Sequence, residues 1–145
     1  MKVPTRSPTH ADVDSSRLAA IGLELEELAD GGALELARVI ELAEDRGRPV
    51  GHYLAAIPLA TELQLAAPAG ARVTVRACAG TCQRYGALEL LDHLAAHHAG
   101  CALQPVACLD RCDEAPAVEI HGAHGRLVLA PASAAGLDEA IGALR

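Results

Sequence analysis

In the first half of the chain, apolar residues recur at intervals of three and four, which is the period of one face of a helix. The interval from Asp14 or Ser15 to the sequence Asp30-Gly31-Gly32 holds the clearest stripe and predicts a first helix, capped by a polar side chain and ended by glycine. The residues of this stripe are Leu18, Ile21, Leu25 and Leu28.

Two further helices are expected before residue 69. One is predicted from about Ala33 to Arg46, and another begins near Val50. Pro58 should interrupt or restart this third helix, because proline lacks a backbone N–H and crowds the preceding turn. The stripe then continues to Leu63 and is broken by Ala67-Pro68-Ala69-Gly70.

The pattern changes at Arg72, where valines begin to alternate with polar residues as in a β-strand. From there the expected order is β-α-β-β-β-α, which is typical of a compact α/β domain of the thioredoxin type. The chain therefore divides into a flexible tail (1–13), an N-terminal helical segment (14–68) and an α/β domain (69–145). The expected elements of the last part are strands at 72–78, 103–109, 117–120 and 126–130, and helices at 83–97 and 134–144.

Four of the five cysteines form two matched pairs at the ends of expected strands. The pairs are Cys78-Ala-Gly-Thr-Cys82 and Cys108-Leu-Asp-Arg-Cys112, with three residues inside each pair and twenty-five between them. Ligand sites in open α/β sheets gather at the carboxyl ends of the strands. Four thiolates at such an edge would suit zinc or an iron–sulfur cluster.

Other roles for the cysteines stay open at this point. A disulfide framework fits small secreted chains, whereas this sequence begins without an apolar signal segment. Structural zinc would satisfy four thiolates, although neither pair lies on a recognisable zinc-ribbon hairpin. A redox dithiol would use one pair and leave the other unexplained. A 2Fe–2S cluster uses all four cysteines, and we favour it.

The residues from Leu63 to Ala87, together with Cys108-Leu-Asp-Arg-Cys-Asp-Glu-Ala-Pro-Ala-Val118, resemble the thioredoxin-like 2Fe–2S ferredoxin family. That family includes the small peripheral cluster subunit of respiratory complex I, the gamma subunit of soluble NAD-dependent formate dehydrogenases and the small diaphorase subunit of bidirectional hydrogenases. The resemblance implies that Cys78, Cys82, Cys108 and Cys112 ligate a 2Fe–2S cluster. It also implies an electron-carrier subunit whose partner binds flavin (FMN) and NAD. Complex I subunits usually have four residues inside the first pair, one more than here.

Composition narrows the class of partner. Aromatic residues make up 1% of the chain and the formal net charge is −7, which argues against nucleic acids, since these need stacking platforms and a basic surface. No apolar run approaches the roughly 20 residues that span a bilayer, so membrane insertion is not expected. With no visible secretory signal, we expect a reducing, cytoplasmic location.

The remaining cysteine and the histidines have mostly structural explanations. Cys101 is expected to be a small buried apolar residue. His93 and His97 share one helix face, but no acidic or cysteine partner for them or for His98 is visible in the sequence. We therefore expect these to be surface histidines. Pro116 precedes a strand, where thioredoxin folds often hold a cis proline, and an ordinary trans proline would fit equally.

Overall fold

The computed structural model describes residues 13–144 except 30, 81–82, 84 and 110–113. The predicted flexible tail thus lies outside the described residues, apart from its last member. That residue, Val13, is buried, and its amide donates a hydrogen bond of 2.8 Å to the side chain of Gln83.

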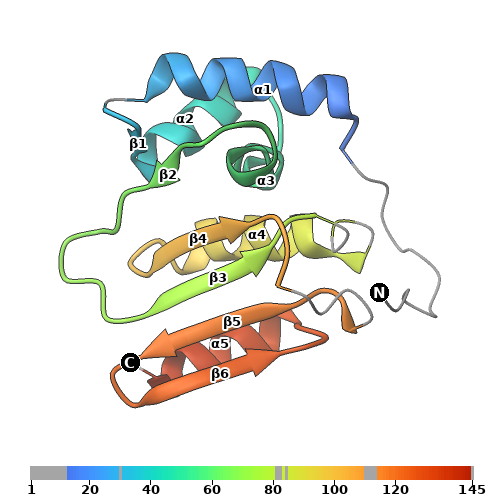
Figure 1. Ribbon diagram of the computed structural model, residues 1–145. Helices are drawn as coiled ribbons and strands as arrows, with labels where there is room; N and C mark the ends of the chain where they lie inside the picture. The colour runs from blue at the N-terminus through green and yellow to red at the C-terminus, as the bar shows by residue number, and fades with distance from the viewer. Residues whose placement is uncertain (1–12, 30, 81–82, 84, 110–113, 145) are drawn as a thin grey trace.

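The described residues form five helices and six strands, which confirms the expected mixed α/β class (Figure 1). The elements in chain order are α1 (Ser15–Leu28), β1 (Ala33–Leu34), α2 (Leu36–Arg46), α3 (Val50–Ala60), β2 (Gln64–Leu65), β3 (Thr74–Cys78), α4 (Ala87–His97), β4 (Ala102–Val106), β5 (Val118–Gly122), β6 (Gly125–Leu129) and α5 (Ala134–Leu144).

The first helix begins where the sequence predicts, because the Asp14 carboxylate accepts a hydrogen bond of 2.7 Å from the Ser16 amide. Two other expectations for this half were wrong. The predicted start of α2 at Ala33 is instead strand β1, which pairs in parallel with β2. Pro58 does not interrupt α3, which continues to Ala60. It lies in the last turn, two residues before the helix ends.

Helix α3 is the centre of the helical segment. It packs against α1 and α2 on one side and against α4 and the edge strand β4 on the other (Figure 1). Its side chains Tyr53, Leu54 and Ile57 are at most 2% exposed, and they belong to one apolar core that continues to α5. This helix is therefore buried on both sides, by α1 and α2 and by the α/β half of the chain.

The larger sheet has the strand order β4-β3-β5-β6, with β3 parallel to β4 and the β5–β6 hairpin antiparallel to β3. Helices α4 and α5 lie behind the strands in Figure 1, on one face of this sheet. The predicted order β-α-β-β-β-α is confirmed. Two bounds were wrong, since α4 begins at Ala87 rather than Gln83 and β4 ends at Val106, before the second cysteine pair. The Ala115–Pro116 peptide bond is cis.

Among the described residues, no helix combines the length and the apolar character that crossing a membrane requires.

Candidate functional site

The two cysteine loops leave the sheet side by side. Strands β3 and β4 run in parallel, and their register places Cys78 opposite Val106. The backbone beyond them stays paired, because the Ala79 amide donates a hydrogen bond of 2.7 Å to the Val106 carbonyl. Cys108 follows two residues later and is exposed, whereas Cys78 is 2% exposed. One cysteine of each predicted pair therefore lies at the same carboxyl edge of the sheet.

Close backbone packing fixes the first loop against the second. A Cβ atom on Gly80 would lie 2.3 Å from the carbonyl oxygen of Ala107, so the position requires glycine. The same carbonyl oxygen lies 3.6 Å from the Cys78 Sγ, within reach of a weak S–H donor. The Ala107 carbonyl is thus the point at which both loops meet.

The other two predicted ligands, Cys82 and Cys112, lie outside the described residues. Gln83, which follows Cys82, is 3% exposed, and its side-chain amide donates a hydrogen bond of 2.7 Å to the Ala79 carbonyl. Its side-chain oxygen accepts the hydrogen bond from Val13. Sequence reasoning gave Gln83 no role, because its partner Val13 is 70 residues away.

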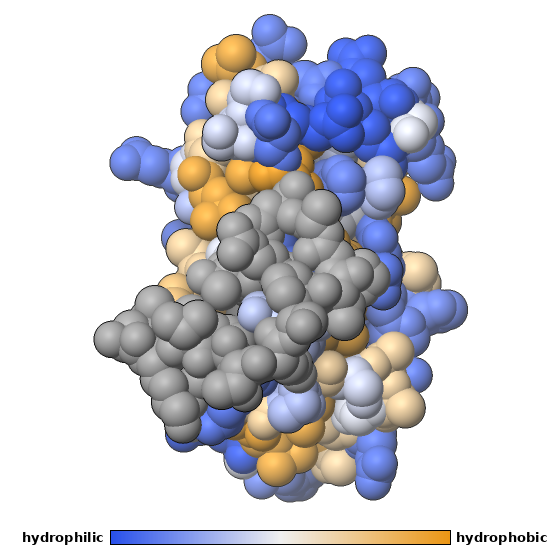
Figure 2. Space-filling view, turned by 90° about the vertical axis from the view of Figure 1, so that its right-hand side faces the viewer, coloured by the Kyte–Doolittle hydropathy of each residue, from blue (hydrophilic) through white to orange (hydrophobic). Residues whose placement is uncertain are grey.

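The surroundings of Cys78 are apolar. It packs in a small cluster separate from the main core, with the buried alanines Ala87, Ala115 and Ala117. Figure 2 looks at the molecule from this end. Hydrophilic residues dominate its upper right, and apolar residues reach the surface at the upper left and again at the bottom. Among the described residues this edge offers two cysteine sulfurs, one buried and one exposed, and thiolate ligands suit zinc or an iron–sulfur cluster.

Cys101 has a different environment from the paired cysteines. It precedes β4, is 3% exposed and packs within the main apolar core. The expectation of a small buried apolar residue is confirmed.

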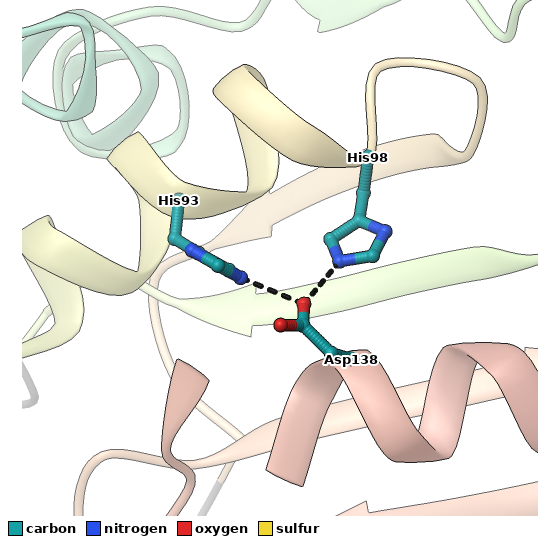
Figure 3. Close-up of side chains that lie close together, drawn as sticks. All are labelled: His93, His98 and Asp138. Carbon is teal, nitrogen blue, oxygen red and sulfur yellow. Dashed lines mark hydrogen bonds and ion pairs between the residues drawn. The ribbon is translucent and has the colours of Figure 1, made fainter. Parts of the chain in front are cut away.

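A second group of ligand-type side chains joins α4 to α5 (Figure 3). The Nε2 atoms of His93 and His98 lie 2.7 Å and 2.6 Å from the same oxygen of Asp138, its Oδ1. These hydrogen bonds, from His98 first and His93 second, lower the pKa of the Asp138 carboxyl. The expectation of surface histidines was wrong for His98, which is 9% exposed and has an acidic partner. His97 is exposed, as expected.

The opposite face of the sheet carries its own charged pairs. His121 hydrogen-bonds to Glu119 within β5, and this contact is the main cause of a lowered pKa of the Glu119 carboxyl. Arg76 on the neighbouring strand lies 3.5 Å from the same carboxylate oxygen. These exposed or half-exposed pairs contribute little to stability.

Comparison with known proteins gives no further constraint. No protein-family model matches the chain, and none of the curated protein sequences matches it.

Proposed function

We propose that the chain is an electron carrier in which Cys78, Cys82, Cys108 and Cys112 hold a 2Fe–2S cluster. The observation that carries this proposal is the common edge of Cys78 and Cys108, reached from two parallel strands whose ends stay hydrogen-bonded. The second cysteine of each pair follows the first by four residues. Each loop would then supply two sulfurs, and the parallel pairing of β3 and β4 would hold the two loops close together.

The finer fold assignment is part of the same proposal. A β-α-β unit (β3-α4-β4) followed by a β-hairpin and a helix (β5-β6-α5) supports a thioredoxin-like domain. In such a sheet the turn after the first strand and the turn after the second strand flank one site, which is where the two cysteine motifs fall.

The described residues would support the cluster in two ways. Burial of Cys78 among alanines keeps water from that sulfur, and solvent exposure and hydrogen bonding are what tune cluster potentials. Gln83 is anchored to the Ala79 carbonyl on one side and to the Val13 amide on the other, which fixes the residue next to Cys82. The cluster would supply one-electron transfer.

The partner we propose is a flavin- and NAD-binding subunit of a soluble oxidoreductase, such as a formate dehydrogenase or a complex I-type assembly, in the cytoplasm. Hydride chemistry needs a nicotinamide or flavin cofactor, and the sequence has no glycine-rich dinucleotide motif. In this role the chain itself is not catalytic. A stand-alone ferredoxin and a zinc-stabilised interaction module are the alternatives.

The deciding experiment is the visible spectrum of the anaerobically purified full chain, with iron and acid-labile sulfide measured per chain. We expect a coloured protein that dithionite bleaches, with about two iron atoms and about two sulfide ions per chain. A colourless protein with zinc at the cysteines would favour the interaction module. A coloured chain that never binds a flavoprotein would favour the stand-alone ferredoxin.

Serine variants identify the ligands. Replacing Cys78, Cys82, Cys108 or Cys112 singly should lower the iron content, because a hard oxygen replaces a soft thiolate. Cys101→Ser is the matched control, since Cys101 is equally buried but lies in the main core. It should keep its colour. Loss of colour in Cys101→Ser, with retention in Cys78→Ser, would contradict the ligand set.

A further inference from the structure

The group formed by His93, His98 and Asp138 has a geometry that simple surface pairing does not require. Both histidines present the same ring atom, Nε2, to one carboxylate oxygen. One ligand-type atom from each residue lies within 4.8 Å of the others (Figure 3). His98 is buried, whereas the Asp138 side chain is 51% exposed. The group is thus held from the protein side and open toward solvent.

The local backbone explains how the two histidines converge. In a continuous helix, residues five apart point about 140° away from each other. Helix α4 ends at His97, and His98 adopts non-helical dihedral angles of φ −131° and ψ 35°. This break turns the His98 ring toward the face that carries His93. The helices beneath are fixed by buried side chains, including Leu94 on α4 and Ile141 on α5.

We propose that His93, His98 and Asp138 form a binding site for Zn²⁺, independent of the cysteine edge. Two imidazoles and one carboxylate are a donor set that zinc accepts, with water in the fourth position. Calcium and magnesium prefer oxygen ligands throughout. The exposed side of Asp138 leaves room for that water, and the zinc ion would join α4 to α5.

The three donor atoms lie within 4.8 Å of one another, so zinc binding requires changes of at most about 1.5 Å in their separations. Donors around tetrahedral zinc, with bonds of about 2.0–2.1 Å, lie about 3.3 Å apart. The present Nε2–Oδ1 distances are 2.6 Å and 2.7 Å, so each pair must separate by roughly 0.6–0.7 Å. The half-exposed aspartate allows this by a change of its own side-chain torsion. Each imidazole proton would then sit on Nδ1 while Nε2 binds the metal.

The lack of one hydrogen bond limits the affinity of the site for zinc. The Nδ1 atom of His98 is buried and has no hydrogen-bond partner among the described residues. Zinc-binding histidines usually donate this second N–H to an acceptor, and loss of such a partner costs about 10–100-fold in affinity. We therefore expect weaker binding than at a fully supported zinc site of the same ligands.

The test measures zinc bound per chain at increasing free Zn²⁺, under reducing conditions, on the full chain. Wild type should bind one zinc more than Asp138→Asn or His98→Gln. Zinc held by cysteines is common to all variants and cancels in the difference. Asp138→Asn keeps an oxygen that accepts the histidine hydrogen bonds but removes the charged ligand, so it separates metal binding from helix-to-helix attachment. His97→Gln is the matched control and should bind as much zinc as wild type.

Nitrogen NMR of the histidine rings gives a readout that does not depend on the variants folding. On addition of Zn²⁺, the Nε2 resonances of His93 and His98 should shift, and those of the exposed His97 should not. Equal zinc binding by wild type and Asp138→Asn, or unchanged ring resonances of His93 and His98, would overturn the site. Iron at the cysteines is measured separately, so the cluster proposal and the zinc proposal fail independently.

Discussion

The amide of Gly51 donates a hydrogen bond of 2.5 Å to the Asp92 carboxylate. Gly51 is in the first turn of α3, where backbone N–H groups have no partner within the helix. Asp92 lies on α4, so a side chain of the α/β half caps a helix of the N-terminal half. Burial raises the pKa of this carboxyl despite the hydrogen bond. The contact joins the two halves of the chain.

Gly51→Ala should destabilise the protein, because the new Cβ atom would lie 2.3 Å from the carbonyl oxygen of Leu88 on α4. Neither atom can move by rotation of a side chain, because a Cβ atom and a carbonyl oxygen are both fixed to the backbone. Helix α3 must therefore move away from α4. Overpacking of this kind costs about 1–3 kcal/mol. The measurement is the free energy of unfolding in urea. Gly142→Ala is the control, since nothing lies within 4 Å of its added Cβ, and it should be neutral or stabilising by about 0.5 kcal/mol.

His52 on α3 should make stability fall below pH 6.5. Burial, the largest cause, lowers the pKa of His52 from its ordinary value of 6.5, and the nearby Asp92 charge offsets this only in part. The folded state therefore favours the neutral ring. Its contribution is complete above pH 6.5 and is lost as pH falls through the lowered folded-state pKa. The slope is at most about 1.4 kcal/mol per pH unit.

His52→Gln tests this dependence, because glutamine keeps a polar side chain without the titration. Unfolding free energies measured from neutral pH down to about pH 5 should fall less steeply in His52→Gln than in wild type. His124→Gln, which removes an exposed histidine of the β5–β6 turn, should keep the wild-type slope. Parallel slopes for wild type and His52→Gln would show that burial of this ring is not coupled to folding.

The periodicity of apolar residues predicted most of the elements, because local spacing decides which face of a helix or strand is buried. It failed where tertiary contacts outweigh local preference. Ala33–Leu34 form a strand only because β2, thirty residues later, pairs with them. Pro58 stays helical because Tyr53, Leu54 and Ile57 bury the same helix.

In the candidate sites, too, local spacing was predictive and contacts between distant residues were not. The cysteine spacing placed Cys78 and Cys108 at strand ends, and the parallel pairing of β3 and β4 brings them to one edge. The partnership of His98 with Asp138 was not predictable, since the two residues are 40 positions apart and no local pattern links them. An acidic residue on the solvent side of an amphipathic helix carries no sequence signal of such a partnership.

Glu24 should matter more than an ordinary surface charge, because it connects three helices. Its carboxylate accepts hydrogen bonds from Arg46 Nε at 2.6 Å and from the Tyr53 hydroxyl at 3.1 Å. Tyr53 is fully buried on α3, so removal of the carboxylate leaves a buried hydroxyl without this acceptor. We expect Glu24→Ala to cost about 1–3 kcal/mol in thermal or urea unfolding.

Tyr53→Phe provides the comparison for Glu24. It removes the hydroxyl together with its need for a partner, so the loss should be smaller, at about 0.5–1.5 kcal/mol. In the Tyr53→Phe background, Glu24→Ala should cost less than it does in wild type, since the two side chains share one interaction. Strictly additive losses would show that the Glu24–Tyr53 hydrogen bond does not contribute to folding.

Gly80→Ala tests whether the contact between the two cysteine loops is needed for the proposed cluster. The added Cβ atom would meet the Ala107 carbonyl oxygen at 2.3 Å, and that carbonyl also contacts the Cys78 sulfur. The loops must then separate, which moves one cysteine of each pair without changing any thiol. We expect lower iron content per chain and a stability loss of about 1–3 kcal/mol. Gly100→Ala, also in a turn beside β4 but with no atom within 4 Å of the new Cβ, should keep wild-type iron content. If Gly80→Ala keeps full iron content while its stability falls, the closeness of the loops supports folding alone, and cluster binding depends on other parts of the edge.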